Sequence, residues 1–258
     1  MASLKGRVLR AVGHTGYRRF IVLTRSRTGS NLLVSFLDSH PNVRALGEIV
    51  RVRGKPHIDI IDAAFGKAPR RIRAKGFKVF YYHPVRENNR AMWEYLAAMD
   101  GLHVIHLKRR NILRSTVSQK IAMNAGVWKT KNPGSIQAAP RKQVSLAVDE
   151  LERRFVATRK WERDGDALFQ DHPMLTIHYE DLVADTGATF GQVTDFLGVP
   201  YVEPRSALVR QNPEPIRALI SNYDELLAAF RGTEWEPFFH EPSAGLAAGT
   251  ALVEEAVG

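Results

Sequence analysis

The sequence predicts an α/β protein in which helices flank a central, mainly parallel sheet. Three observations support this fold class. Short apolar runs rich in β-branched and aromatic residues alternate with helical patterns along the chain. A glycine turn follows the first of these runs and opens a helix. Hydrophobic residues make up 44% of the 258 residues, which is enough for a substantial core.

The expected elements follow one another in regular alternation. Strands are expected at residues 19–24, 76–82, 103–108 and 174–179. Helices are expected at residues 31–39, 87–99, 111–124, 143–164 and 186–197. Because such alternation favours parallel pairing, the ligand should lie beyond the carboxyl ends of the strands.

The turn after the first strand carries the most informative residues, Arg-Thr-Gly-Ser-Asn at positions 27–31. The first amides of a helix have no partner inside the helix and carry the positive end of its dipole. A strand that leads into such a turn therefore forms a socket for a phosphate or sulfate. Gly29 lets the backbone approach the anion, and Thr28, Ser30 and Asn31 can donate hydrogen bonds to it. Arg27 adds positive charge.

This turn differs from the phosphate loop of ATP-binding kinases, because Gly-Lys-Ser/Thr occurs nowhere in the chain. A loop built around Arg27 indicates a donor other than ATP. Arg25, just before the loop, is open to two interpretations: a second anion ligand or a surface charge at the strand end. The second is favoured.

The charge of the chain indicates anionic partners. Thirty-seven Lys and Arg residues against 27 Asp and Glu give a net charge of +10. The basic residues are scattered and no nucleic-acid-binding motif is present, so nucleic acid is not expected as a partner. A polyanionic cofactor with an acidic glycan or lipid surface explains the charge, and peripheral contact with such a surface is open to the protein.

The termini and the missing cysteines suggest a soluble, cytoplasmic bacterial protein. The chain has no Cys and no apolar stretch of membrane-spanning length. Residues 1–17 form a basic segment without the apolar centre of a secretory signal. A single domain is expected at 18–240, followed by a mobile tail at 241–258. Two long connections, 50–74 and 125–142, are interpreted as acceptor-side loops or surface insertions, with neither favoured.

Four segments of the chain occur in the order of a known family. The first runs from the Arg27 loop through the His40-Pro41 turn to Glu48. The others are H-V-I-H-L-K-R-R-N-I-L-R-S-T-V-S at 103–118, H-Y-E-D-L at 178–182 with F-L-G-V at 196–199, and I-S-N-Y-D-E-L at 220–226 with G-T-E-W at 232–235. Together they resemble sulfotransferases that use 3′-phosphoadenosine-5′-phosphosulfate (PAPS), and look closest to the bacterial carbohydrate and lipopolysaccharide type. The resemblance implies the P-loop-like sulfotransferase fold.

The resemblance implies a role for each donor-site residue. Arg27 would hold the 5′-phosphate and stabilise the leaving group, with Thr28, Gly29, Ser30 and Asn31 as further donors. Ser118 would hold the 3′-phosphate together with an arginine. Counting from the strand selects Arg109, and counting eight residues back from Ser118 selects Arg110, so both are candidates. The family requires no metal, and no metal-ligand cluster is apparent in the sequence.

Two residues compete for the role of general base. Glu48 follows the His40-Pro41 turn, where carbohydrate-type relatives carry a catalytic glutamate. His83 follows a strand, somewhat as the histidine base does in the small-molecule branch. Glu48 is favoured, although several relatives read Glu-Pro where this chain has Ile49. Lys78 faces the site or simply begins a strand.

The resemblance predicts an enzyme that moves a sulfuryl group from PAPS to a hydroxyl, releasing adenosine 3′,5′-bisphosphate. The expected acceptor is a carbohydrate, glycolipid or lipopolysaccharide precursor. A small-molecule alcohol or lipid is the first alternative. A nucleoside-type kinase and a basic nucleic-acid-binding protein are the remaining two, and the missing phosphate-loop lysine disfavours the kinase.

Overall fold

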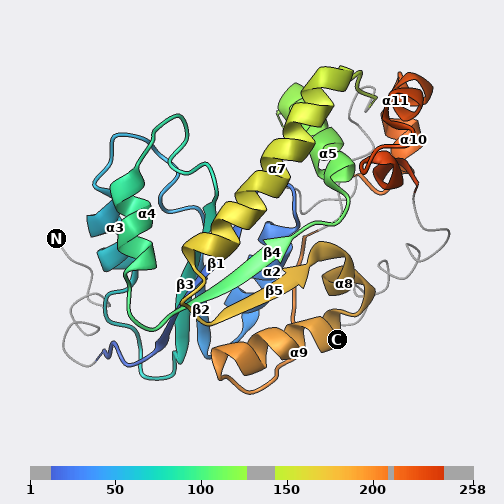
Figure 1. Cartoon of the computed structure of the whole chain (residues 1–258). Coiled ribbons are helices and arrows are strands. Elements are labelled where there is room, and N and C mark those ends of the chain that lie inside the picture. The colour runs from blue at the N-terminus through green and yellow to red at the C-terminus, as the bar shows by residue number, and fades with distance from the viewer. Residues whose placement is uncertain (1–12, 127–142, 209–211, 241–258) are drawn as a thin grey trace.

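The computed structural model describes residues 13–126, 143–208 and 212–240. Its centre is a sheet of five strands in the order β2-β3-β1-β4-β5. Every neighbouring pair is parallel. The predicted α/β class with a parallel sheet between helices is therefore confirmed (Figure 1).

Four of the strands coincide with predicted ones to within two residues. They are β1 (Arg18–Thr24), β3 (Ala74–Phe80), β4 (Leu102–Lys108) and β5 (Met174–His178). The fifth, β2 (Val43–Leu46), was not predicted. It has only four residues, lies at the edge of the sheet and carries the exposed Arg44, so its apolar pattern is weak.

Helices cover both faces of the sheet. On one face α2 (Ser30–Ser39), α8 (Tyr179–Ala184) and α9 (Thr186–Leu197) bury apolar side chains against the strands. On the other face α3 (His57–Ala64) and α4 (Arg90–Ala97) do the same. Helix α3 lies inside the connection 50–74, which the sequence analysis treated as a loop. The alternation of Phe20 and Val22 with Ile21 and Leu23 along β1 supplies both cores.

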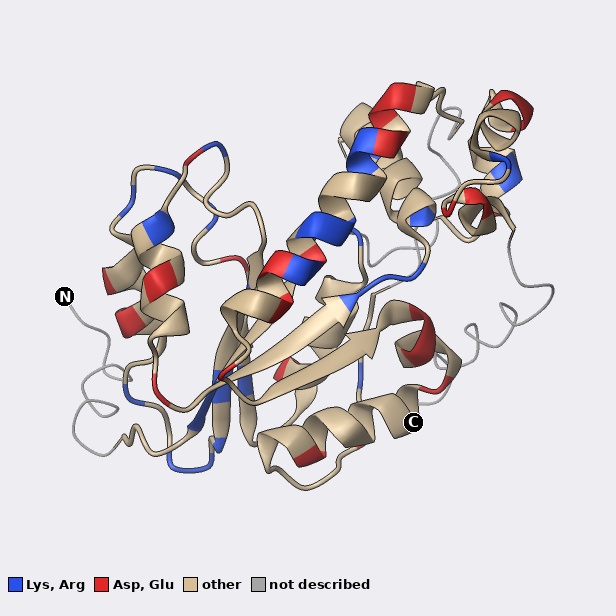
Figure 2. Cartoon of the chain, viewed as in Figure 1, with Lys and Arg blue, Asp and Glu red and all other residues tan. Residues whose placement is uncertain are grey.

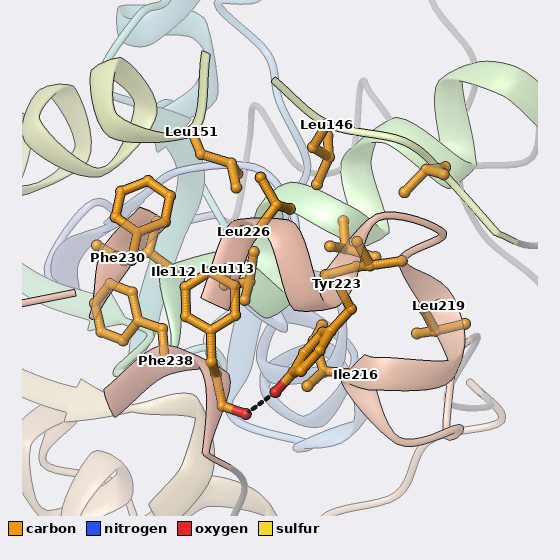
Figure 3. Close-up of a cluster of buried hydrophobic side chains, with 14 of the residues drawn as sticks. Ile112, Leu113, Leu146, Leu151, Ile216, Leu219, Tyr223, Leu226, Phe230 and Phe238 are labelled. Carbon is orange, nitrogen blue, oxygen red and sulfur yellow. Dashed lines mark hydrogen bonds between the residues drawn. The ribbon is translucent and has the colours of Figure 1, made fainter. Parts of the chain in front are cut away.

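A third hydrophobic cluster lies beyond the sheet. It joins α5 (Ile112–Ala125) and α7 (Val148–Leu168) to α10 (Ile216–Leu219), α11 (Tyr223–Phe230) and the 3₁₀ turn η1 (Glu236–Phe239). Figure 3 shows Phe230 and Phe238 packed beside Leu113, and the Tyr223 hydroxyl donating a hydrogen bond to the Phe239 carbonyl. Burying one such side chain contributes about 1.5–3 kcal/mol, so the cluster fixes α5 and α7 firmly.

Helix α7 departs most from its prediction. It begins at Val148 rather than at residue 143, because Val144 instead pairs with Ile220 in an isolated bridge. It continues to Leu168, and in Figure 1 it runs from the sheet to the lobe that holds α10 and α11. Among the helices that the structure describes, none has the length and apolar character needed to cross a membrane.

The strand order locates the ligand site. The chain passes from β1 to β2 and β3 on one side and then to β4 and β5 on the other, so the topology switches direction at β1. Open parallel sheets bind ligands in the crevice at this switch point, beyond the carboxyl ends of the strands. The segments that follow β1, β3 and β4 therefore form the candidate site.

Candidate active site at the carboxyl ends of the central strands

The loop after β1 is held in shape by its own hydroxyl groups. Thr28 Oγ1 donates to the Arg25 carbonyl at 2.8 Å and lies 2.6 Å from Thr24 Oγ1. Thr24 Oγ1 in turn lies 2.6 Å from the Leu107 carbonyl on β4. Helix α2 then begins at Ser30 with no side-chain cap. The loop thus presents helix N-terminal amides on a rigid base, while the Thr28 hydroxyl is occupied inside the loop.

Two loop residues adopt left-handed backbone conformations. Gly29 has φ 81° and Arg27 has φ 65°. A Cβ at Gly29 would lie 2.2 Å from Cδ2 of Tyr179, so this glycine also makes room for the tyrosine ring. Arg27 is not glycine, and such a conformation costs a non-glycine residue about 1–2 kcal/mol. Strained backbone of this kind concentrates at functional sites.

The Arg27 side chain forms a cationic cluster with Arg109 and Ser118. Arg27 Nε donates to Ser118 Oγ at 2.9 Å, and Arg109 Nη1 donates to the Arg27 carbonyl at 2.8 Å. The guanidinium of Arg109 also lies 4.5 Å from the centre of the Tyr179 ring. Burial, and secondarily the neighbouring Arg109 charge, lower the pKa of Arg27. Arg109 Nε also lies 3.8 Å from the Glu180 carboxylate, and two arginines held this close favour binding of a further anion.

The structure separates the two arginines that the sequence left as alternatives. Arg110 forms a bidentate ion pair with Asp181, with N–O distances of 2.6 and 2.7 Å. Its side chain is 52% exposed, whereas that of Arg109 is 13% exposed. Arg109 therefore lies with Arg27 and Ser118, and Arg110 lies outside this cluster on the surface.

A second cluster contains both candidate bases. Lys78 Nζ, at the end of β3, lies 3.0 Å from Glu48 Oε1 and donates to Asn31 Oδ1 at 2.7 Å. His83 Nε2 lies 3.7 Å from the other Glu48 oxygen. The buried Lys78 thus connects the first turn of α2, directly after the Arg27 loop, to the Glu48 carboxylate.

The geometry of His83 limits what its ring can do. Burial lowers the pKa of His83 to about 4, so the ring is neutral at neutral pH. Its Nδ1 accepts a hydrogen bond from the Phe80 amide at 3.2 Å. The single ring proton must then sit on Nε2, the atom that faces Glu48. Glu48 itself has a side chain that is 25% exposed.

The predicted surface position of Arg25 is wrong. Arg25 is only 4% exposed, because α7 crosses the end of β1 and covers it. Its guanidinium donates to Thr158 Oγ1 and, at 3.4 Å, to Gln119 Oε1. Burial is also the main reason that the pKa of Arg25 falls to about 10. The sequence around Arg25 does not indicate that a distant helix packs over this residue.

Other residues and segments named in the sequence analysis lie in the core, outside the described residues or beside the candidate site. Trp235 is buried in the third hydrophobic cluster. The connection 125–142 lies almost wholly, and the tail 241–258 entirely, outside the described residues. Within the described ranges, no group of three or more His, Asp or Glu side chains could hold a metal ion. Lys78 and Tyr179 lie beside the candidate site residues; the sequence left the role of Lys78 open and did not place Tyr179 there.

Known proteins similar to this chain include sulfotransferases and nodulation proteins. A family model described as "Sulfotransferase family" matches residues 91–204, a span that includes Arg109, Ser118 and Tyr179. Nodulation protein H of Rhizobium tropici is 28% identical over 240 residues, covering 85% of this chain and 92% of the relative. Nodulation protein H of Rhizobium meliloti (strain 1021) is 28% identical over 237 residues, covering 85% and 94%. A sulfotransferase structure from Alicyclobacillus acidocaldarius aligns with a TM-score of 0.49 and 14% identity, covering 85% of this chain and 91% of that one.

The fold is a parallel α/β sheet with a cluster of basic side chains at the carboxyl ends of its central strands. The matches with the family model and with the nodulation proteins support a sulfotransferase enzyme of the PAPS-using type. The use of PAPS as donor is a general property of this family.

Proposed function

We propose that this enzyme transfers the sulfuryl group of PAPS to a hydroxyl of a carbohydrate, glycolipid or lipopolysaccharide-type acceptor, in the cytoplasm. One observation carries the proposal. The cationic loop after β1 and the carboxylate after β2 are joined by a single buried side chain, Lys78, which contacts Asn31 at 2.7 Å and Glu48 at 3.0 Å. Sulfuryl transfer needs a site for the donor anion and a base for the acceptor hydroxyl side by side.

The donor half of the proposal assigns the two phosphate groups. The amides of residues 27–31 and the Arg27 guanidinium bind the 5′-phosphosulfate. Arg109 and Ser118 bind the 3′-phosphate, because both contact Arg27 while Arg110 is paired with Asp181. Arg27 stabilises the charge that develops on the leaving phosphate.

The base half of the proposal assigns the proton to Glu48. The acceptor oxygen attacks sulfur, the bond from sulfur to the bridging oxygen breaks, and the acceptor proton passes to the Glu48 carboxylate. His83 is a weaker candidate, because Nδ1 is occupied by the Phe80 amide and Nε2 carries the proton. Its neutral ring beside the carboxylate instead orients Glu48, and Lys78 holds the other oxygen.

The resemblance of the Arg27 loop, the His40-Pro41 turn and Glu48 to the carbohydrate type supports a glycan acceptor. The net charge of +10 fits acceptors that are themselves acidic. A small-molecule alcohol or lipid is the alternative, and it is tied to the histidine-base branch. The identity of the base and the class of the acceptor are therefore linked: Glu48 as the base favours a glycan acceptor, and His83 as the base favours a small-molecule acceptor.

The direct test is nucleotide binding followed by thermal unfolding. Adenosine 3′,5′-bisphosphate at about 100 times its dissociation constant should stabilise the fold by about 2.7 kcal/mol. ATP at the same concentration should stabilise much less, because it lacks the 3′-phosphate. Equal shifts with the two nucleotides would overturn the PAPS assignment.

A further inference from the structure

A groove opens behind the Arg27 loop, on the side of α5 and α7. It has a volume of about 440 Å³, and Arg25, Tyr82, Gln119, Arg154, Thr158 and Trp161 line it. Small-molecule sites typically fall between about 300 and 1,000 Å³. We call it the α7 groove. None of the donor or base residues assigned above lines it.

The α7 groove adjoins the reaction centre through chain neighbours. Gln119 follows Ser118, Tyr82 precedes His83, and Arg25 lies two positions before Arg27. The Ser26 amide donates to the Tyr82 hydroxyl at 3.1 Å, which joins the loop to the groove wall. The α7 groove therefore lies beside the Arg27 loop.

Arg25 gives the groove an unusual buried charge. Its described partners, the Thr158 hydroxyl and the Gln119 carbonyl, are neutral, and its Nε has no hydrogen-bond partner although it is buried. No carboxylate among the described residues lies within ion-pair distance of it. A buried cation compensated only by neutral groups is costly to the fold, so a bound anion would stabilise it.

The other walls suit a sugar ring. Tyr82 and Trp161 lie with ring centres 5.5 Å apart at 52°, and both are partly exposed. Aromatic rings of this kind offer an apolar face together with a polar edge. Arg154 reaches Gln119 at 3.2 Å and forms an ion pair with Glu150 at 2.9 Å, so the wall beside Arg25 is polar. Figure 2 shows the blue and red bands of charged residues along α7.

We propose that the α7 groove holds the acceptor, and that Arg25 binds a carboxylate, phosphate or sulfate group carried by that acceptor. The inference rests on the proposed function and deepens it, because it makes the substrate an acidic carbohydrate. The donor sulfuryl group is the other possible source of the oxyanion. The acceptor is favoured because the Arg25 guanidinium contacts Thr158 on α7 and Gln119 on α5, and no residue of 27–31 lines the groove.

The test compares acidic and neutral sugars on the enzyme, with and without saturating adenosine 3′,5′-bisphosphate, by calorimetry. Glucuronate and glucose 6-sulfate should bind more tightly than glucose. Arg25→Met should weaken the two acidic sugars by roughly 10- to 100-fold and leave glucose unchanged, since hydrogen bonds to a charged group are lost. Arg90→Met, which removes an exposed charge on α4, is the matched control and should bind like the wild type.

Each contrary result has a distinct meaning. Equal affinity of the wild type for acidic and neutral sugars would overturn the inference. If Arg25→Met weakens PAPS but not adenosine 3′,5′-bisphosphate, Arg25 holds the donor sulfuryl group and the acceptor assignment is wrong. If adenosine 3′,5′-bisphosphate does not bind while the sugars bind as expected, the PAPS assignment is wrong and the assignment of the α7 groove to the acceptor is retained.

A second variant keeps the test decisive if Arg25→Met does not fold. Trp161→Ala removes the aromatic wall without touching the Arg27 loop. It should weaken glucose and glucuronate alike, with the affinity for adenosine 3′,5′-bisphosphate unchanged. Unchanged sugar binding in this variant would show that the groove is not the acceptor site.

Discussion

Two charged clusters flank the end of β1, and they are built in opposite ways. On the β4 side, Arg27 and Arg109 bring like charges together, and their proximity helps to lower the pKa of Arg27. On the β3 side, Lys78, Glu48 and His83 place a cation, a carboxylate and a neutral ring in contact. Two adjoining guanidinium groups favour binding of an anion, whereas a cluster that contains a carboxylate can accept a proton. This difference supports the proposal that the donor binds on the β4 side and that the base lies on the β3 side.

Removing the carboxylate should give the largest effect. Glu48→Gln keeps the size of the side chain and removes the proton acceptor, so turnover should fall by roughly 10²–10⁴-fold with little change in nucleotide affinity. His83→Asn, the matched variant of the same cluster, should be far milder. Steady-state rates with calorimetric nucleotide binding measure both. The reverse ranking would make His83 the base and weaken the glycan proposal.

Removing charge from the other cluster should affect binding as well as rate. Arg27→Ala should lower turnover by roughly 10²–10³-fold, because its charge faces the breaking bond, and should also weaken the nucleotide. If turnover fell while affinity remained intact, Arg27 would not be a donor ligand.

Variants of Arg109 and Arg110 test which of the two arginines acts together with Arg27 and Ser118. Arg109→Ala and Ser118→Ala should weaken adenosine 3′,5′-bisphosphate, the arginine variant by roughly 10- to 100-fold, with turnover at saturation changed less. Arg110→Ala breaks only the surface pair with Asp181 and should bind almost normally. A larger loss for Arg110 than for Arg109 would show that Arg110 leaves Asp181 for the 3′-phosphate.

Buried histidines should make the fold sensitive to acid. Burial lowers the pKa of His83 and of His106 to about 4. Because the unfolded chain binds these protons near pH 6.5, the stability from keeping each ring neutral is fully present above that pH. It is lost as the pH falls from about 6.5 to 4, by up to about 3 kcal/mol per histidine. Unfolding in urea across this range measures the slope. His106→Gln should flatten it and the exposed-site variant His240→Gln should not.

Relieving the backbone strain at Arg27 should raise the stability of the fold by a small amount. Arg27→Gly fits the φ of 65° without strain, whereas Arg27→Ala does not. The glycine variant should therefore be more stable than the alanine variant by about 1 kcal/mol, although both lose activity. Equal unfolding midpoints would show that the loop relaxes when the arginine is removed.

Much of this arrangement was predictable, because it is encoded locally. The apolar run of β1 and the turn at Gly29 predicted both a strand and an anion loop, and the structure has the strand and the helix at those places. The burial of Arg25 was not predictable, because it depends on α7, more than 120 residues later, packing over the strand end. The contact of Lys78 with Asn31 and Glu48 likewise joins β3 to α2 and to the segment after β2. The order of the strands in the sheet brings such residues together, and the hydrophobic periodicity of the sequence does not encode this order.

The central claim is that the two clusters form one site around a single nucleotide, and a crystal structure with adenosine 3′,5′-bisphosphate tests it most directly. The 5′-phosphate should lie on the amides of residues 27–31, and the 3′-phosphate should contact Arg109 and Ser118. The Glu48 carboxylate should face the open space beyond the 5′-phosphate, within reach of an acceptor hydroxyl. A nucleotide bound elsewhere, or a Glu48 side chain turned to solvent away from the 5′-phosphate, would contradict the account.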